Sequence, residues 1–364
     1  RLVTGYQEND NYIRRIEQGN KVVLGTVTII GTRASVPIRG IEEAIGCSVH
    51  WISGDERSIR WRSFNVEPPR LFIQGGYHCR AFMSLGQDCR DHGGHVVLTS
   101  DHNWQGSIRQ RILDPIRYRL LFKKKFDAIF VAGESGRVFY QKMGVPNTQI
   151  YSGLYSADPE IFKPGPSLSQ RPKNLLFVGQ LIERKNILQL CEAFISMHAE
   201  NPEWSLHIYG AGELADSVPT HPAIVQSHFA KPVQLSRVMR SSRCLVLPSH
   251  EENWGVVVHE AALSGCALAL SNQVGAAADF AVNKNSVKFC SRSKSDMVKA
   301  LQEVMSWSEK QWDEAGCVSL ERALRFSPLN FANTVEQLAH DIVNSSGLRG
   351  VTTELSAMQT DEML

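Results

Sequence analysis

The sequence predicts an α/β protein with two doubly wound domains, and three observations carry this prediction. With 364 residues, the chain is long enough for two domains of ordinary size. In its second half, short β-rich runs alternate with segments of helical period. That alternation indicates parallel strands connected by helices. Glycine-containing turns follow several of the runs, and doubly wound sheets bind ligands beyond the carboxyl ends of their strands.

The first half shows the same alternation less regularly. Strands are predicted over Lys21–Ile30, Ser48–Ile52, Arg70–Ile73, His95–Leu98 and Ala128–Val131. Helices are predicted over Ile41–Ile45 and Arg80–His92. The polar, arginine-bearing stretch Ser53–Pro69 between them is typical of a loop or insertion.

The second half is easier to interpret. Its predicted strands are Leu175–Val178, Leu206–Tyr209, Ala223–Gln226, Cys244–Leu247, Ala267–Leu270 and Val287–Cys290. Its clearest helical segments are Ile187–Ala199 and Met297–Trp307. Three prolines with Gly and Ser in Phe162–Pro172 indicate an interdomain linker. We therefore expect domains over residues 1–165 and 166–325, and a polar tail over 346–364.

Composition excludes several classes of protein. A hydrophobic fraction of 43% and a charged fraction of 21% are those of a soluble globular chain. The net charge of +2 identifies no partner. No apolar run approaches the ~20 residues that a membrane-spanning helix needs. The 8 cysteines form no C-x-x-C pair, so we expect neither structural zinc nor a disulfide framework, but buried thiols in a reducing cytosol.

The most informative stretch is Pro248–Ala261, which carries two carboxylates, Glu252 and Glu260, on either side of Gly255. A helix starting near Gly255 would aim unpaired N–H groups and partial positive charge at a phosphate. The Glu260 carboxylate would lean toward the same helix start and accept hydrogen bonds from a ribose diol. Glu252 would hold sugar hydroxyls. The alternatives are an exposed acidic loop with a solvated helix, or a strand over the valine run 256–258.

Two further turns follow predicted strands. In Phe177–Asn186, Lys185 would direct an ammonium at a diphosphate, and Arg184 would bind it bidentately. A basic helix start on the surface is the alternative there. Glycines 210 and 212 would let the backbone approach a ligand closely, and an ordinary tight βα turn is the alternative.

Together these motifs resemble the nucleotide-sugar glycosyltransferases of the GT-B fold, specifically retaining family four (group 1). The resemblance is strongest over Asn174–Asp279 and continues weakly back over Ala128–Pro164. It implies two Rossmann-like doubly wound domains that face each other across a cleft. The N-terminal domain would bind the acceptor and the C-terminal domain the nucleotide-sugar donor. A helix over residues 326–345 would pack back on the N-terminal domain, and the domains would close over substrates.

The resemblance also implies roles for single residues. Lys185 resembles the lysine that binds the donor diphosphate, whereas Gln180 stands where the family most often has an arginine. Whether Arg184 takes the place of that arginine is left open. Glu252 resembles the carboxylate that faces the donor sugar, and Glu260 the one on the ribose. The remaining predicted donor-binding residues are Gly179, Gly210, Asn253, Trp254, Gly255 and Val256.

The acceptor side is predicted after the strand His95–Leu98. His102 resembles the histidine that many family members place near the donor sugar, and Asp101 would orient it or bind acceptor hydroxyls. A histidine in this position is otherwise a structural residue. The predicted catalytic residues are therefore His102, Lys185 and Glu252. No D-x-D motif stands at a suitable place, so we expect a metal-independent reaction and no cofactor besides the donor substrate.

The segment 109–126 holds seven basic residues, a single acid, Asp114, and interleaved apolar residues. The favoured interpretation is an ordinary amphipathic helix, broken at Pro115, with a solvated basic face. The other is peripheral contact with an anionic membrane that presents a lipid-linked acceptor. Nucleic acid is not an expected partner, because no binding motif is present and the net charge is near neutral.

The expected function is transfer of a sugar from a nucleoside diphosphate to a saccharide or lipid-linked acceptor, with retention, in bacterial surface polysaccharide or glycolipid synthesis. The expected location is the cytoplasm, including the inner face of the membrane. A nucleotide-sugar epimerase and a non-catalytic nucleotide-sugar-binding protein remain alternatives. The sequence identifies neither the base, sugar, acceptor and linkage nor the oligomeric state.

Overall fold

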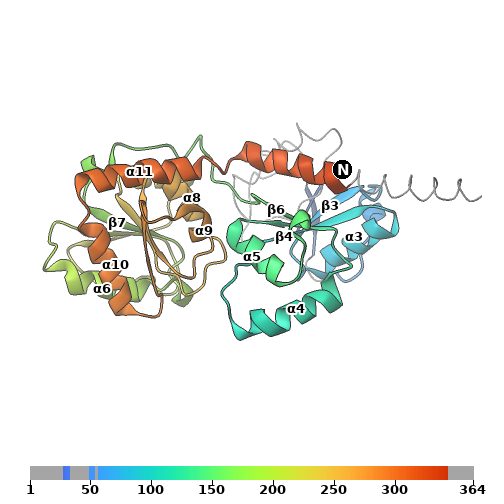
Figure 1. Ribbon diagram of the computed structural model, residues 1–364, viewed down its shortest axis with the longest axis horizontal. Helices are drawn as coiled ribbons and strands as arrows, with labels where there is room; N and C mark the ends of the chain where they lie inside the picture. Colours follow the sequence, from blue (N-terminus) through green and yellow to red (C-terminus); the bar gives the residue numbers. More distant parts are fainter. Residues whose placement is uncertain (1–27, 33–48, 54–55, 343–364) are drawn as a thin grey trace, which may run out of the picture.

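The computed structural model describes residues 28–32, 49–53 and 56–342, which form two α/β domains side by side (Figure 1). The predicted helix Ile41–Ile45, most of the predicted strand Lys21–Ile30 and the tail from residue 343 lie outside these residues.

The N-terminal domain is built on a parallel four-stranded sheet of order β3-β4-β5-β6. Its strands are β3 (Leu71–Gly75), β4 (His95–Ser100), β5 (Ala128–Val131) and β6 (Ile150–Ser152). A parallel pair, β1 (Ile29–Thr32) and β2 (Val49–Ile52), lies beside it. The helices are α3 (Arg80–Asp91), α4 (Asp114–Arg117) and α5 (Glu134–Lys142), with 3₁₀ turns η1 (Trp61–Phe64) and η4 (Asn147–Gln149). All of β5 is buried, as expected of a strand covered on both faces.

The C-terminal domain has a parallel six-stranded sheet of order β12-β11-β10-β7-β8-β9. Its strands are β7 (Asn174–Val178), β8 (Ser205–Tyr209), β9 (Ile224–Ser227), β10 (Cys244–Leu247), β11 (Ala267–Ser271) and β12 (Ser286–Phe289). Its helices are α6 (Ile187–His198), α7 (Pro232–Arg240), α8 (Val256–Leu263), α9 (Ala277–Phe280), α10 (Lys294–Met305) and α11 (Glu309–Ala323), with turns η5 (Leu168–Gln170), η6 (Glu183–Lys185) and η7 (Ala215–Ser217). The strand order reverses between β7 and β10, which is where ligands bind in such sheets.

Most predicted strands agree with the structure to within one or two residues. The short strand β6 was missed because three residues carry no alternation to recognise. The expected break at Pro115 is wrong. Residues 108–122 form one continuous helix, in which α4 lies between two π-helical segments, η2 (Arg109–Leu113) and η3 (Tyr118–Phe122). The wider turns shift the backbone hydrogen bonds around a proline that cannot donate one.

The expected linker Phe162–Pro172 is not extended. Phe162 and Leu168 are each only 1% exposed and belong to the core of the C-terminal domain. The buried Arg171 guanidinium donates to the carbonyls of Ser242 at 2.8 Å and Ser264 at 2.9 Å, which fixes this segment to the same domain. The chain therefore leaves the N-terminal domain earlier, after the buried Leu154.

A helix over residues 328–342 returns the chain to the N-terminal domain. Figure 1 shows it following α11 along one side of the molecule. Its buried residues Phe331, Val335 and Leu338 pack in one cluster with Phe130 of β5 and Val97 of β4. The chain thus passes between the domains twice, after residue 154 and again before residue 328.

The imidazole of His259, on α8, joins both passages. Its Nδ1 accepts a hydrogen bond from the backbone N–H of Ala157 at 2.8 Å, and its Nε2 lies 3.0 Å from the carbonyl oxygen of Ala323. Since Nδ1 accepts, Nε2 must carry the hydrogen that the carbonyl receives. A neutral ring with that tautomer satisfies both contacts.

Within residues 28–32, 49–53 and 56–342, no helix is long and apolar enough to cross a bilayer.

Candidate functional site

Three of the predicted donor-side motifs meet at the carboxyl ends of β7, β8 and β10. Gly179 follows β7, and its N–H donates to the carbonyl of Tyr209 at the end of β8 at 3.1 Å. The next turn, beginning at Gly210, is joined to the first because the N–H of Leu181 donates to the carbonyl of Ala211 at 2.9 Å. The two glycine turns therefore form one connected rim at the place where the strand order reverses.

Lys185 and Glu252 form an ion pair between the first turn and the segment after β10. Their side chains are only 12% and 11% exposed. The Ser249 hydroxyl lies 3.4 Å from the same carboxylate oxygen. Opposite charges this shielded from water interact more strongly than an exposed pair. The structure thus brings together two of the three predicted catalytic side chains.

Two other residues of the first turn, Gln180 and Arg184, lie differently. Gln180 is exposed. Arg184 donates through Nη1 to the carbonyl of Glu251 at 2.7 Å, and its own carbonyl accepts the N–H of His250 at 2.9 Å. These bonds attach the acidic segment after β10 to η6. Contact between Arg184 and a diphosphate stays a prediction.

The helix predicted to start near Gly255 is α8. Gly255 is its N-cap and has φ of +90°, a conformation that glycine adopts without strain. Val256 is the first helical residue, and the helix start carries partial positive charge toward the rim. Glu260 lies inside this helix, and desolvation raises the pKa of its carboxyl to about 7. The carboxyl is therefore poised to change its charge near neutral pH.

Asn253 is partly exposed, but the Trp254 side chain is 3% exposed and faces the N-terminal domain. Its indole packs against Phe280 and Phe326, with ring centroids 5.8 and 6.0 Å apart, and its N–H has no partner among the described residues. Its carbonyl accepts the N–H of Ala276 at 3.0 Å.

The two domains touch beside Glu252. The side-chain amide of Asn103, which is 5% exposed, donates to the carbonyls of Glu252 at 2.9 Å and Gln273 at 3.2 Å. Sequence reasoning missed Asn103 because its partners lie 149 and 170 positions away. No local pattern reports a contact of that separation.

A second contact lies at the start of α5. The Asp279 carboxylate, from α9, accepts the N–H of Glu134 at 3.0 Å. Desolvation raises the pKa of Asp279 to about 6. At Gly133, a Cβ would lie 2.3 Å from that carboxylate and 2.5 Å from the Trp254 indole, so only a glycine allows this approach. Asp279 and Gly133 were likewise missed.

His102 lies after β4 with both ring nitrogens near hydroxyls. Nδ1 is 2.9 Å from the Ser100 hydroxyl, and Nε2 is 3.4 Å from the Tyr77 hydroxyl. The ring lies between those of Tyr77 and Phe139, with centroids 5.8 and 5.4 Å away. Desolvation lowers the pKa of His102, and the charge of Asp101 opposes this only in part. The imidazole is therefore held neutral and oriented.

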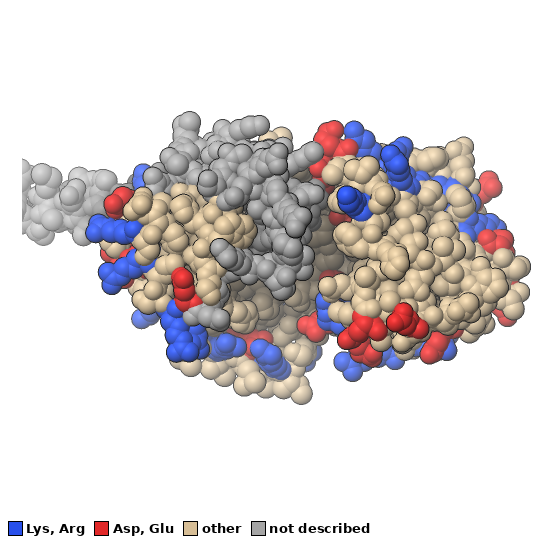
Figure 2. Space-filling view, turned by 180° about the vertical axis from the view of Figure 1, so that it is seen from behind, with Lys and Arg blue, Asp and Glu red and all other residues tan. Residues whose placement is uncertain are grey.

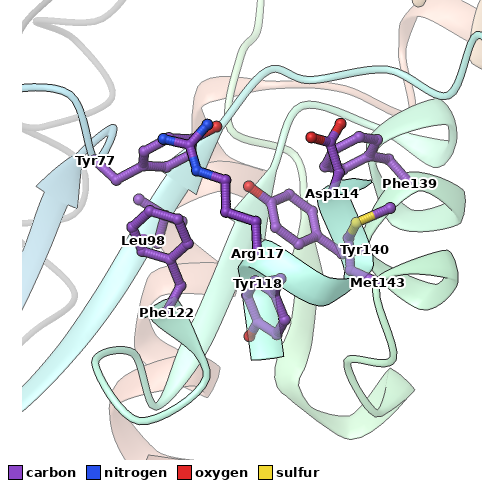
Figure 3. A pocket seen from close by; sticks show the side chains of 9 residues that line it. All are labelled: Tyr77, Leu98, Asp114, Arg117, Tyr118, Phe122, Phe139, Tyr140 and Met143. Atoms are coloured by element: carbon purple, nitrogen blue, oxygen red, sulfur yellow. The ribbon is translucent and has the colours of Figure 1, made fainter. Parts of the chain in front are cut away.

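Tyr77 and Phe139 also line a pocket beneath the 108–122 helix (Figure 3). Its free volume is about 30 Å³. The other lining residues are Leu98, Asp114, Arg117, Tyr118, Phe122, Tyr140 and Met143. The Arg117 guanidinium lies over the Tyr77 ring, 5.9 Å from its centroid, as Figure 3 shows. An aromatic pocket with a cation at its edge thus adjoins His102.

Among the residues described, no group of three or more His, Cys, Asp or Glu side chains is arranged to hold a metal ion.

A known protein family matches the C-terminal half of the chain. Residues 159–316 match the model of the family "Glycosyl transferases group 1". That match covers the C-terminal sheet and the whole rim of the donor-side motifs. No curated protein matches the chain in sequence.

Several solved structures share the fold of nearly the whole chain. Anabaena HepE, solved in complex with UDP and glucose, has a TM-score of 0.69 at 10% identity and covers 92% of this chain and 98% of its own. Sucrose-phosphate synthase from Thermosynechococcus elongatus has a TM-score of 0.69 at 12% identity, and the match covers 94% of this chain and 99% of the synthase. Trehalose 6-phosphate synthase from Burkholderia multivorans has a TM-score of 0.69 at 13% identity, and the match covers 95% of this chain and 99% of that synthase.

These findings confirm the expected fold, because the chain has the GT-B fold, with two Rossmann-like domains. Residues 159–316 are similar to the glycosyltransferases of group 1. The roles of single residues stay predictions.

Proposed function

We propose that this protein transfers a glycosyl group from a nucleoside-diphosphate sugar to an acceptor hydroxyl, with retention of the anomeric configuration. The single observation that carries the proposal is the shielded Lys185–Glu252 pair beside the start of α8, at the reversal point of the C-terminal sheet. A cation and a helix start suit a diphosphate, and a carboxylate suits sugar hydroxyls. When a donor binds, Lys185 and Glu252 would separate, so that the lysine binds the diphosphate and the carboxylate binds the sugar hydroxyls.

In the proposed reaction, the bond between the anomeric carbon and the diphosphate oxygen breaks, and a bond to the acceptor oxygen forms on the same face. The acceptor proton passes to the departing phosphate. Negative charge grows on that phosphate, and Lys185 and the α8 start would stabilise it. A helix start contributes about 0.3–1 kcal/mol, or up to ~2 when partly buried, so the poorly solvated Lys185 must contribute more. The proposal needs no metal or cofactor besides the donor.

On the acceptor side, the proposal assigns His102 to the space near the donor sugar and Asp101 to acceptor hydroxyls. A neutral His102 accepts a hydrogen bond from a hydroxyl more readily than a protonated one. We propose a saccharide or a lipid-linked saccharide as the acceptor. We propose cytoplasmic synthesis of a bacterial surface polysaccharide or glycolipid as the setting.

A thermal-shift screen with UDP-, GDP- and ADP-sugars tests the donor assignment, because a ligand that binds only the folded state raises the apparent stability. UDP-glucose is the first compound to try, since HepE was solved with UDP and glucose. A shift that Glu252→Ala and Lys185→Ala both abolish supports the assignment. No shift with any nucleotide sugar would overturn it.

Product analysis then separates the alternatives. Incubation with the donor alone should leave the sugar unaltered, whereas an epimerase would release an altered one. Turnover with an acceptor should give a product with the donor's anomeric configuration. Donor binding without any turnover would instead favour a non-catalytic nucleotide-sugar-binding protein.

A further inference from the structure

The 108–122 helix exposes an apolar row to solvent. Ile108, Ile112, Ile116 and Leu120 recur at four-residue intervals and are 79%, 56%, 53% and 77% exposed. Residues at this spacing lie on one side of a helix. Leu113 and Leu121 are also exposed, by 60% and 52%. Contiguous exposed apolar side chains of this size are uncommon on a monomeric protein and indicate an interaction surface.

The opposite row of the same helix is the one that packs on the N-terminal domain. Gln110 accepts the N–H of Gln105 at 2.8 Å and donates to the carbonyl of Asn103 at 2.9 Å. Two turns further on, Tyr118 is 9% exposed, and it lines the pocket of Figure 3. A surface helix normally buries its apolar side and exposes its polar side. Here a largely polar and aromatic row is anchored and the aliphatic row faces outward.

Positive charge flanks the aliphatic row. The basic residues of this segment are Arg109, Arg111, Arg117, Arg119, Lys123, Lys124 and Lys125. The acid among them, Asp114, lies 3.4 Å from Arg109. Figure 2 shows Lys and Arg side chains along the lower edge of the N-terminal domain, the edge that carries α4 in Figure 1. Two copies of this chain would bring like charges together if they paired through this helix, which disfavours a second copy as the partner.

We propose that the 108–122 helix docks the protein on an anionic lipid bilayer. The aliphatic row enters the boundary between headgroups and acyl chains, and the flanking Arg and Lys side chains bind the lipid phosphates. Either signal alone gives marginal, reversible binding, and together they give stable attachment. The pocket lined by Tyr77 and Phe139, and His102 beyond it, then lie within about one helix diameter, ~10 Å, of the bilayer. A hydroxyl presented at the membrane surface would reach the acceptor side directly.

Vesicle co-sedimentation of the whole chain tests this inference and needs no turnover. The probes are vesicles of phosphatidylcholine alone and of phosphatidylcholine mixed with phosphatidylglycerol. The first variant is Ile116→Asp/Leu120→Asp. Its matched control is Val233→Asp, on α7, where the valine is 56% exposed, close to the 53% of Ile116, but lies in the other domain. The second variant, Lys123→Gln/Lys124→Gln/Lys125→Gln, removes only charge.

We expect the wild type to bind the anionic vesicles more tightly than the neutral ones, and less tightly at high salt. Each lost lysine should weaken binding about fivefold. Loss of the two buried aliphatic side chains should weaken it about a hundredfold or more. Val233→Asp should bind as the wild type does. Circular dichroism melting should be unchanged in all variants, because the substituted side chains are exposed.

Two results would overturn the inference. One is a wild type that stays in the supernatant with anionic vesicles at low salt. The other is an Ile116→Asp/Leu120→Asp variant that binds them as tightly as the wild type. Light scattering that detects a wild-type dimer which this variant dissociates would assign the row to a second copy instead. None of these outcomes bears on donor binding by the C-terminal domain.

Discussion

The side-chain amide of Asn103, in the N-terminal domain, donates a hydrogen bond to the backbone carbonyl of Glu252, in the C-terminal domain, at 2.9 Å. Glu252 is the residue expected to face the donor sugar, and Asn103 follows His102, the residue expected on the acceptor side. One hydrogen bond therefore links the two halves of the candidate site. The position of each half depends on the other.

Asn103→Ala should lower kcat more than it weakens donor binding. The carbonyl of Glu252 would lose a partner from the other domain, whereas Lys185 and α8 would stay in place. A hydrogen bond of this kind contributes about 0.5–1.5 kcal/mol, which corresponds to a loss of roughly twofold to twelvefold in rate. Steady-state kinetics together with donor titration measures both. Asn201→Ala, which removes an amide bonded at 3.0 Å to a carbonyl within the C-terminal domain, is the control and should change neither. A drop in affinity as large as the drop in kcat would contradict the linkage.

Lys185→Ala should weaken donor binding at least tenfold, about 1.4 kcal/mol, because the diphosphate loses its cation. It should also lower the melting temperature without ligand, since the Glu252 carboxylate stays in a poorly solvated place without its partner. Isothermal titration and thermal melting measure the two effects. Lys173→Ala serves as the matched control, because Lys173 pairs with Glu203 at 2.9 Å but is 45% exposed. Equal effects of the two substitutions would count against the diphosphate assignment.

Glu260 should make both stability and donor affinity depend on pH. Its pKa is raised from 4.5 to about 7 by desolvation, so between these values the folded protein binds more protons than the unfolded chain. The free energy of unfolding should therefore fall as pH rises from 4.5 to 7, by up to about 3 kcal/mol. Donor affinity should change in the opposite sense, because only the ionised carboxylate accepts both hydrogen bonds of a ribose diol.

Urea unfolding and donor titration across this pH range measure the two slopes. Glu260→Gln should remove the Glu260 contribution to both and bind the donor more weakly. A variant with wild-type slopes would show that another group titrates.

Gly133→Ala should separate the domains without unfolding either. The added methyl group would meet the Trp254 indole and the Asp279 carboxylate, and both belong to the other domain. We expect a larger radius of gyration by small-angle scattering, weaker catalysis and preserved donor binding. Trp254→Ala removes one of the obstacles, so the double variant should lie closer to the wild type in shape than Gly133→Ala does. Additive effects of the two substitutions would mean that they do not meet.

The sequence predicted where the donor-side residues lie in the fold, and their roles stay predictions. Lys185, Glu252 and Gly255 lie on turns that directly follow strands, so the strand pattern already places them at one edge of a sheet. Trp254 was predicted to bind the donor, but its side chain lies at the contact between the domains. Patterns within one segment identify such turns and do not report which way each side chain faces.

The interdomain contacts could not be predicted in the same way. Asn103 and Asp279 each bind a backbone group of the other domain, and only the folded arrangement brings those groups near. The rings of Tyr77 and Phe139 around His102 come from different segments, so a single motif does not contain them. The π-helical turns around Pro115 depend on the packing of one helix on the domain beneath it. Local propensity favours a break there.

His259 has a consequence for how the protein moves. Its ring contacts Ala157 and Ala323, which belong to the core of the C-terminal domain just inside its two connections to the N-terminal domain. The two connections therefore begin close together beside α8. A rotation of one domain against the other would have its pivot near this imidazole. Displacements then grow with distance from the pivot, so a small turn at His259 becomes a wide excursion at the far rim of each domain.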